Sequence, residues 1–219
     1  MKDLKITSHT IRGGDTASEP KRRGNRTTRI PEILHVALNV FAAEGYVGFT
    51  QRRIANVAGI GLSTLQHYFG TREELLRSCI RELSHRYIAE YRKLAKDKAR
   101  SPDERIERIV DQAFELLTGP ERFTGAFVLH CWSLAEHEPF VNELMAENQS
   151  ELIEIFLGLV EEINPSLPSD ECGLRAKLIV SHLAGLIVFV RRRGDREASW
   201  DALRVATKAV WKALSRTPQ

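Results

Sequence analysis

Apolar residues recur at helical spacing along almost the whole chain from Ile30 onward. The first clear stripe consists of Ile33, Leu34, Ala37, Leu38 and Phe41, which follow the 3.6-residue period of an amphipathic helix. No segment of useful length alternates apolar and polar side chains as the strands of a half-buried sheet do. The pattern therefore predicts an all-α protein of about nine helices with no sheet.

Capping residues, glycines and prolines divide this pattern into segments. Thr50 is a suitable N-cap, Gly45 a suitable left-handed stop, and Thr71 and Ser101 each begin a capping box that ends in glutamate three residues later. We expect helices over residues 30–45, 51–58, 62–68, 71–98, 101–117, 121–137, 139–163, 169–193 and 199–215. The fourth, about 28 residues long at roughly 1.5 Å per residue, is long enough to belong to two modules.

Composition and charge divide the chain into three parts. Residues 1–26 are poor in large apolar side chains and rich in Gly, Ser, Thr, Lys and Arg, which predicts a flexible basic arm. Lysine and arginine outnumber acidic residues 19 to 10 in residues 1–100, whereas acidic residues predominate 19 to 13 in residues 101–219. The basic half favours a polyanionic partner. The arm either contacts DNA or is an inert solubilising tail, and both interpretations stay open.

Cysteine content and hydropathy indicate the cellular compartment of the protein. The three cysteines, Cys79, Cys131 and Cys172, are widely spaced and odd in number, which argues against a disulfide framework and for reduced thiols. The N-terminal residues include no apolar segment of the kind found in a secretory signal. The most apolar run, residues 183–190, is too short for a bilayer that needs about 20 residues. We therefore expect a cytoplasmic protein that does not enter a membrane.

Residues 27–75 form a predicted three-helix unit around a helix-turn-helix. Its second short helix carries small and polar side chains that are suited to hydrogen bonding with base edges in a major groove. These side chains are Ser63, Thr64, Gln66 and His67. The apolar residues expected to hold the two short helices at a fixed angle are Ile54, Val57, Ile60, Leu65 and Phe69. The unit is therefore a candidate DNA-binding domain, and residues 76–219 are a larger helical body.

Three runs in this unit resemble the signature of the TetR family of transcriptional regulators. They are Phe49 to Ile60, Thr64 to Phe69 and Arg72 to Leu76, and the resemblance extends over about residues 30–83. The resemblance implies a homodimer that binds a palindromic double-stranded operator as a repressor and is released by a small-molecule effector. The last two helices, within about residues 174–214, are the expected dimerisation surface.

The resemblance also implies which residues meet DNA. Arg52 would contact phosphate or a base edge, His67 and Tyr68 would bond phosphates, and Arg72 would lie along the DNA backbone. The residues expected to face the groove are Leu62, Ser63, Thr64 and Gln66. The chain departs from the family pattern at Gly61, where Ser or Thr is usual, and at Gln66, where an aromatic residue is common. Because Gln66 is able to contact adenine through two hydrogen bonds, an atypical operator is expected.

A ligand pocket is predicted where aromatic and polar-tipped side chains concentrate in the body. Such a mixture suits an apolar pocket with a few orienting groups, although aromatic residues at helical spacing are also typical of an ordinary core. The candidates are Phe123, Phe127, His130, Cys131, Trp132, His137 and Phe140. The stretch from Trp132 to Phe140 faintly resembles choline-responsive family members, in which rings hold a cation.

No catalytic, metal or cofactor motif stands out. His130 and His137 are two turns apart instead of the three or four residues typical of a metal pair, and Cys131 beside His130 is adjacency in sequence only. No nucleotide-binding loop is present. We therefore expect a non-enzymatic protein with neither cofactor nor metal. The alternatives are a constitutive or partner-controlled regulator and, from another class, a small cytosolic enzyme with an incidental helix-turn-helix.

Overall fold

The computed structural model describes residues 26–193 and 199–216, and within these ranges the chain forms nine α-helices and no strand. The helices are α1 (Arg26–Gly48), α2 (Gln51–Val57), α3 (Leu62–Phe69), α4 (Arg72–Ala95), α5 (Pro102–Thr118), α6 (Phe123–Ala135), α7 (Pro139–Ile163), α8 (Ser169–Arg193) and α9 (Asp201–Arg216). The predicted all-α fold is confirmed. The predicted arm lies outside the described residues, apart from Arg26, which begins α1.

The predicted capping residues define the helix ends. Thr71 and Ser101 each accept a hydrogen bond from the amide three residues later, and both capping boxes are complete. At Gly45 the backbone leaves helical geometry with φ 64° and ψ −167°. Several boundaries differ from the expected ones: α1 begins at Arg26 instead of Ile30, α6 spans Phe123–Ala135 instead of 121–137, and α4 ends at Ala95 instead of near Lys98. Leu94 is the last buried apolar residue of the stripe, and beyond it the chain turns through hydrogen bonds between backbone groups.

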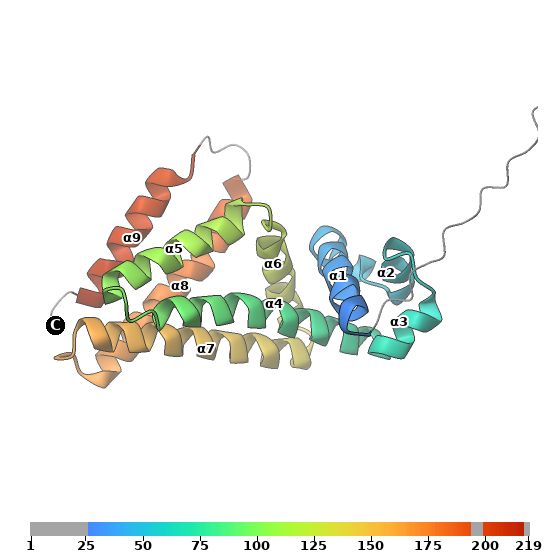
Figure 1. Cartoon of the computed structure of the whole chain (residues 1–219), viewed down its shortest axis with the longest axis horizontal. Helices are drawn as coiled ribbons and strands as arrows, with labels where there is room; N and C mark the ends of the chain where they lie inside the picture. The colour runs from blue at the N-terminus through green and yellow to red at the C-terminus, as the bar shows by residue number, and fades with distance from the viewer. Residues whose placement is uncertain (1–25, 194–198, 217–219) are drawn as a thin grey trace, which may run out of the picture.

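The helices are arranged around the long α4 (Figure 1). Helices α4 and α7 run lengthwise side by side, α1, α2 and α3 gather at one end, and α5, α8 and α9 lie at the other. Helix α6 stands between the two ends and packs against α1, α7 and α8. We call α1, α2, α3 and the first half of α4 the head, and the remaining helices the body.

Two hydrophobic cores lie along this axis, and α4 belongs to both. Its first half contributes Leu75, Leu76 and Cys79 to the core of the head, whereas Ile88 and Tyr91 belong to the core of the body. The head core also takes in side chains from α6 and α7, far beyond residue 75 in sequence. Head and body are therefore joined by continuous apolar packing as well as by one shared helix.

Helix α9 is fixed to the body by charge and by one tryptophan. Trp211 is fully buried, and its Nε1 donates a hydrogen bond to Nδ1 of His182 on α8 at 2.9 Å. Three ion pairs at four-residue spacing join α5 to α9, namely Asp103 with Arg216, Glu107 with Lys212 and Asp111 with Lys208. Because α9 is held on this side, its opposite face stays exposed.

Candidate DNA-binding surface and ligand cavity

Helices α2 and α3 form the predicted helix-turn-helix. The Thr50 hydroxyl caps α2 by accepting a hydrogen bond from the Arg53 amide at 3.2 Å. The turn passes through Gly59 with φ 64°, a conformation that glycine adopts without strain. Ile54 of α2 and Leu65 of α3 are fully buried in the head core, whereas Val57, also expected to hold the helices together, is 47% exposed. This packing fixes α3 relative to α2 and leaves the outer side of α3 free.

Polar side chains cover the outer side of α3. The buried residues Leu65 and Phe69 are four positions apart and face the core, as the helical period requires. The exposed residues of the helix are Ser63, Thr64, Gln66 and His67. Leu62 and Tyr68, at the two ends of this surface, are half-buried, and Arg52 is exposed on α2. The surface thus presents donors and acceptors of the size that a major groove admits.

Arg72, the eighth predicted DNA contact, is engaged within the protein. Its guanidinium carbon lies 3.7 Å from the centroid of the Tyr46 ring, and Nη2 donates a hydrogen bond to the Tyr46 carbonyl oxygen. A cation–π contact of this kind and a charge-assisted hydrogen bond both hold the side chain in place. Arg72 therefore ties the start of α4 to the end of α1.

Sequence inspection missed an ion pair that braces α2. Arg53 donates from Nε and Nη2 to the Glu44 carboxylate at 3.0 and 2.8 Å. The hydrogen bonds from Arg53 lower the pKa of Glu44 below its usual value. Both side chains are at the surface, so the contact orients α2 more than it stabilises the fold. The two residues are nine positions apart on different helices, and no local spacing rule points to such a pair.

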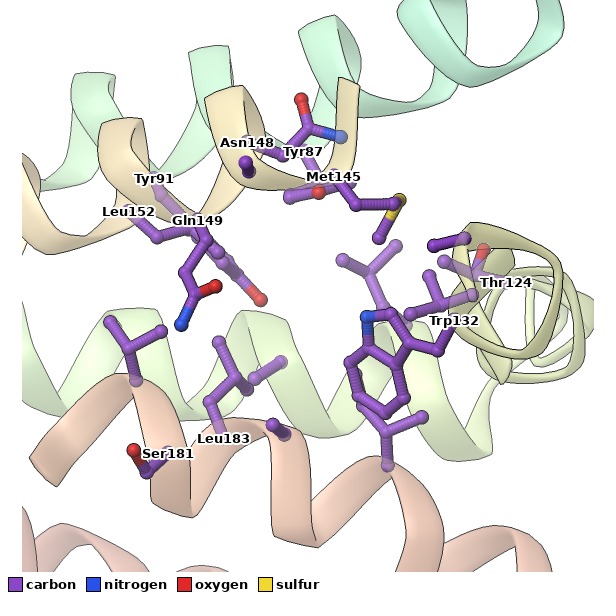
Figure 2. A pocket seen from close by; sticks show the side chains of 18 of the residues that line it. Tyr87, Tyr91, Thr124, Trp132, Met145, Asn148, Gln149, Leu152, Ser181 and Leu183 are labelled. Carbon is purple, nitrogen blue, oxygen red and sulfur yellow. The ribbon is translucent and has the colours of Figure 1, made fainter. Parts of the chain in front are cut away.

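The body contains a cavity of about 570 Å³ bounded by helices α4 to α8 (Figure 2). Its buried wall includes Tyr91, Thr124 and Leu183, while Glu136 and Gln149 are exposed at its rim. Figure 2 shows Tyr91 and Gln149 extending into the space from one side and Trp132 from the opposite side. The remaining lining is mainly aliphatic, from residues of α5, α7 and α8.

Of the seven residues predicted for a ligand pocket, only Trp132 lines this cavity. The core of the head takes Phe123, Phe127, Cys131 and Phe140 instead. The reason is the helical period of α6, which carries two adjacent stripes. Residues 123, 127 and 131 face the head core, whereas Thr124, Val128 and Trp132, one position further on, face the cavity.

The two predicted histidines lie away from the cavity. His130 packs edge-on against Phe41 of α1, with ring centroids 5.7 Å apart. His137 is exposed in the turn after α6. The cavity residues that sequence inspection overlooked come mostly from α4, α7 and α8, and they include Tyr87, Tyr91 and Asn148. Their aromatic and amide side chains are of the kind that lines a ligand pocket. The sequence does not show, however, that these helices, which are far apart in the chain, enclose one space.

The thiols and acidic clusters give no sign of catalytic chemistry. Burial raises the pKa of both Cys79 and Cys131 far above the usual value, which keeps these thiols protonated and unreactive. Within residues 26–193 and 199–216, no group of three or more His, Cys, Asp or Glu side chains is placed to hold a metal ion. What the described residues form is an exposed polar helix at one end and an apolar cavity at the other.

Known proteins that are similar in sequence to this chain are transcriptional regulators. The family model described as bacterial regulatory proteins, tetR family, matches residues 33–79. The chain is 28% identical over 197 residues to the HTH-type transcriptional regulator BetI of Paraburkholderia phymatum, a match spanning 89% of this chain and 97% of the relative. It is also 32% identical over 94 residues to the HTH-type transcriptional repressor KstR2 of Mycobacterium tuberculosis, covering 43% of this chain and 46% of that protein.

Solved structures with the same arrangement of helices are also found. A transcriptional regulator from Saccharomonospora viridis, crystallised in complex with choline, matches with a TM-score of 0.72 over 85% of this chain and 97% of its own. The two sequences are 18% identical, so this likeness shows a shared fold.

Proposed function

Because the chain belongs to the TetR family of DNA-binding transcriptional regulators, we propose that it is a homodimeric repressor of a palindromic operator. In this proposal a small molecule that fills the cavity of the body releases the repressor from DNA. The protein acts by binding and carries out no enzymatic reaction.

The proposed coupling between cavity and head rests on one observation: helix α4 lines the cavity and also contributes to the core of the head. Tyr87 and Tyr91 of α4 lie in the cavity wall, and Leu75 and Leu76 of α4 are fully buried in the head core. A ligand that favours one position of α4 therefore favours one position of the head. By thermodynamic linkage, operator DNA must then oppose ligand binding by the same factor.

We assign DNA recognition to the exposed surface of α3 together with Arg52. Thr64 and Gln66 would contact base edges, whereas His67 and Tyr68 would position the helix on phosphates. We assign Arg72 mainly to holding the head together, since Tyr46 already engages its guanidinium. The proposed DNA-binding domain is thus residues 27–75, supported by packing against the body.

The outer faces of α8 and α9 support a dimer through about residues 174–214. Large apolar side chains on these faces are 41 to 66% exposed: Leu174, Leu178, Val188, Phe189, Val205 and Val210. Helix α8 is also long and apolar enough to cross a membrane by length and composition alone. We propose that a second copy covers this face in the cytoplasm, because α9 continues the same apolar surface. Two-fold symmetry would then match a palindromic operator.

The DNA assignment is tested by selection from a random double-stranded pool. The wild type is expected to enrich one palindromic sequence, and Thr64→Ala and Gln66→Ala to relax its base preference without unfolding the head. Asn56→Ala, an exposed change on α2, serves as the control. Unchanged selection by both α3 variants would contradict the assignment of α3 as the recognition helix.

The ligand assignment is tested by native mass spectrometry of protein purified from its own host. A small molecule that co-purifies, and whose addition releases the protein from the selected DNA, supports the repressor mechanism. Tight DNA binding that no co-purifying molecule alters would instead favour a constitutive or partner-controlled regulator.

A further inference from the structure

The size of the cavity limits the ligands that can fill it. Its volume of about 570 Å³ lies within the range of roughly 300–1,000 Å³ found for sites that enclose drug-sized molecules. Most of its lining is aliphatic, with Leu117, Val128, Leu152, Val180 and Ile187 among the contributors. A ligand that fills this space must therefore bury a large apolar surface.

The charge of the lining argues against an anionic ligand. Among the described residues that line the cavity, none is lysine, arginine or histidine, and the one charged residue is Glu136 at the rim. A carboxylate or phosphate brought into the cavity would lose its hydration and meet no positive partner, which is costly. The buried wall offers a cationic ligand no carboxylate partner, and only the rings of Tyr87, Tyr91 and Trp132 would face its charge.

Hydrogen-bond donors are placed around the apolar space. Thr124 is only 6% exposed, and its hydroxyl has no hydrogen-bond partner among the described residues. Trp132 offers its indole N–H, which is a donor only, from the same helix (Figure 2). Burial raises the pKa of Tyr91, so its phenol stays neutral and remains a donor. The Thr124 oxygen itself has almost no accessible surface, so Trp132 and Tyr91 are the donors that a ligand in the cavity can reach.

We propose that the cavity binds an uncharged, mainly apolar molecule that carries an oxygen acceptor, such as a ketone, an ester or a lactone. The oxygen accepts a hydrogen bond from the indole N–H of Trp132, and the hydrocarbon part packs against α5, α7 and α8. This inference rests on the proposed function only in treating the cavity as the effector site.

The test is a displacement experiment with three ligands of matched chain length. Nile red, an uncharged dye that fluoresces in apolar surroundings, is bound to the full chain and displaced with 2-undecanone, decanoate or decyltrimethylammonium. The ketone is expected to displace the dye at a concentration at least about tenfold below that of either ion, because neither ion finds a charged partner in the buried wall. Trp132→Phe, which removes the indole N–H but keeps an aromatic ring, should weaken the ketone roughly threefold to tenfold.

Controls separate this inference from the proposed function. Ala184→Phe, which fills the cavity, should abolish dye binding, whereas Asn56→Ala in the head should leave it unchanged. Stronger displacement by decanoate or decyltrimethylammonium would overturn the inference while leaving an effector site intact. Displacement by the ketone without release of operator DNA would contradict the coupling instead and leave the ligand class standing.

A second inference concerns Gln51, the first residue of α2 in the head. Its Nε2 donates to the carbonyl oxygen of Gly70 at 2.8 Å, and its Oε1 accepts from Nε2 of Gln66 at 3.4 Å. Because a carbonyl oxygen only accepts, the Gly70 contact fixes which end of the Gln51 amide is the NH₂ group. The remaining oxygen of Gln51 then fixes the orientation of the Gln66 amide.

This orientation leaves Gln66 with the groups that adenine requires. One N–H of Gln66 is used by Gln51, so the second N–H and the carbonyl oxygen stay free. Adenine offers N7 as an acceptor and N6 as a donor in the major groove, which matches this pair. We infer that Gln51 is a positioning residue that aligns Gln66 for adenine, an inference that rests on α3 being the recognition helix.

Selection from a random DNA pool tests the role of Gln51 by its coupling to Gln66. Gln66→Ala should lower discrimination at one base pair per half-site at least about fivefold. Gln51→Met, which keeps the length of the side chain but not its hydrogen bonds, should lower discrimination at that same base pair roughly threefold to tenfold. The double variant should lose no more than Gln66→Ala alone, since both changes act through one contact.

The pattern across operator positions distinguishes positioning from a purely structural role. Gln51→Met that weakens all operator positions equally, or that adds to Gln66→Ala, would show a structural role and overturn the inference. Asn56→Ala, at the far end of α2, should leave every position unchanged. A wild type that selects no sequence would contradict the proposed function itself.

Discussion

A Cβ atom on Gly45 of α1 would lie 3.3 Å from Cε1 of His130 on α6. Gly45 also has φ 64° and ψ −167°, a region that is essentially restricted to glycine. The end of α1 thus approaches α6 closely only because this residue lacks a side chain. The contact belongs to the packing that joins the head to the body.

Gly45→Ala is expected to lower the free energy of unfolding by about 1–3 kcal/mol, because alanine is strained in this backbone conformation and also contacts His130. Chemical denaturation of the purified protein measures the change. Gly59→Ala is a control for positive φ alone, since Gly59 also has φ 64° and a Cβ there would meet nothing within 4 Å. If the two variants lose the same stability, the contact with His130 has no energetic role. Adding His130→Ala to Gly45→Ala should recover part of the difference.

Arg72 and Arg52 are both basic residues of the head, but we expect Arg72 to stabilise the fold and Arg52 to contact DNA. Arg72→Ala removes the contacts with Tyr46 and should lower the free energy of unfolding by about 1–2 kcal/mol. Arg52→Ala should leave unfolding unchanged but reduce the salt dependence of operator binding by about one phosphate contact. Denaturation and binding titrations over a range of salt measure the two effects. An Arg72→Ala variant of full stability would restore the predicted DNA contact.

Glu162 makes the stability of the body sensitive to acid. Hydrogen bonds from Arg105 and Lys98 lower the pKa of this carboxyl from 4.5 to about 2. Because the folded-state pKa lies below the ordinary value, the carboxylate stabilises the fold above pH 4.5, and this contribution is lost as the pH falls toward 2. Glu162→Gln should therefore be less stable at neutral pH and show a shallower loss of stability across that interval. Thermal unfolding at several pH values checks both expectations, and parallel curves for wild type and variant would contradict them.

The outer face of α9 offers a test of dimerisation. Val205→Glu combined with Val210→Glu places two charges on the exposed apolar face and should convert the proposed dimer to a monomer. Light scattering coupled to size-exclusion chromatography gives the mass, and operator affinity should fall in parallel, since one half-site holds a single head weakly. Glu147→Lys, an exposed charge change on α7, should alter neither property. A double variant that stays dimeric would place the interface elsewhere.

The effects that operate within one helix were predictable from the residues alone. Capping boxes at Thr71 and Ser101, the glycine at position 45 and the prolines at positions 102 and 139 define helix ends through local hydrogen bonds and backbone angles. The apolar stripe that buries Leu65 and Phe69 also determines which side chains of α3 stay exposed. The all-α fold and the exposed polar surface of α3 follow from such local effects.

The position of the cavity in the body was decided only by tertiary packing. Helix α6 has apolar side chains on two neighbouring faces, and the helical period cannot show which face meets α1 and which meets the cavity. Packing places Phe127 in the head core and Trp132 in the cavity, because α1 covers one face and α5 and α8 flank the other. Likewise, the contacts of Arg72 with Tyr46 and of Gln51 with Gln66 form only when separate helices pack together. Such contacts depend on distances between helices, which no spacing along one helix encodes.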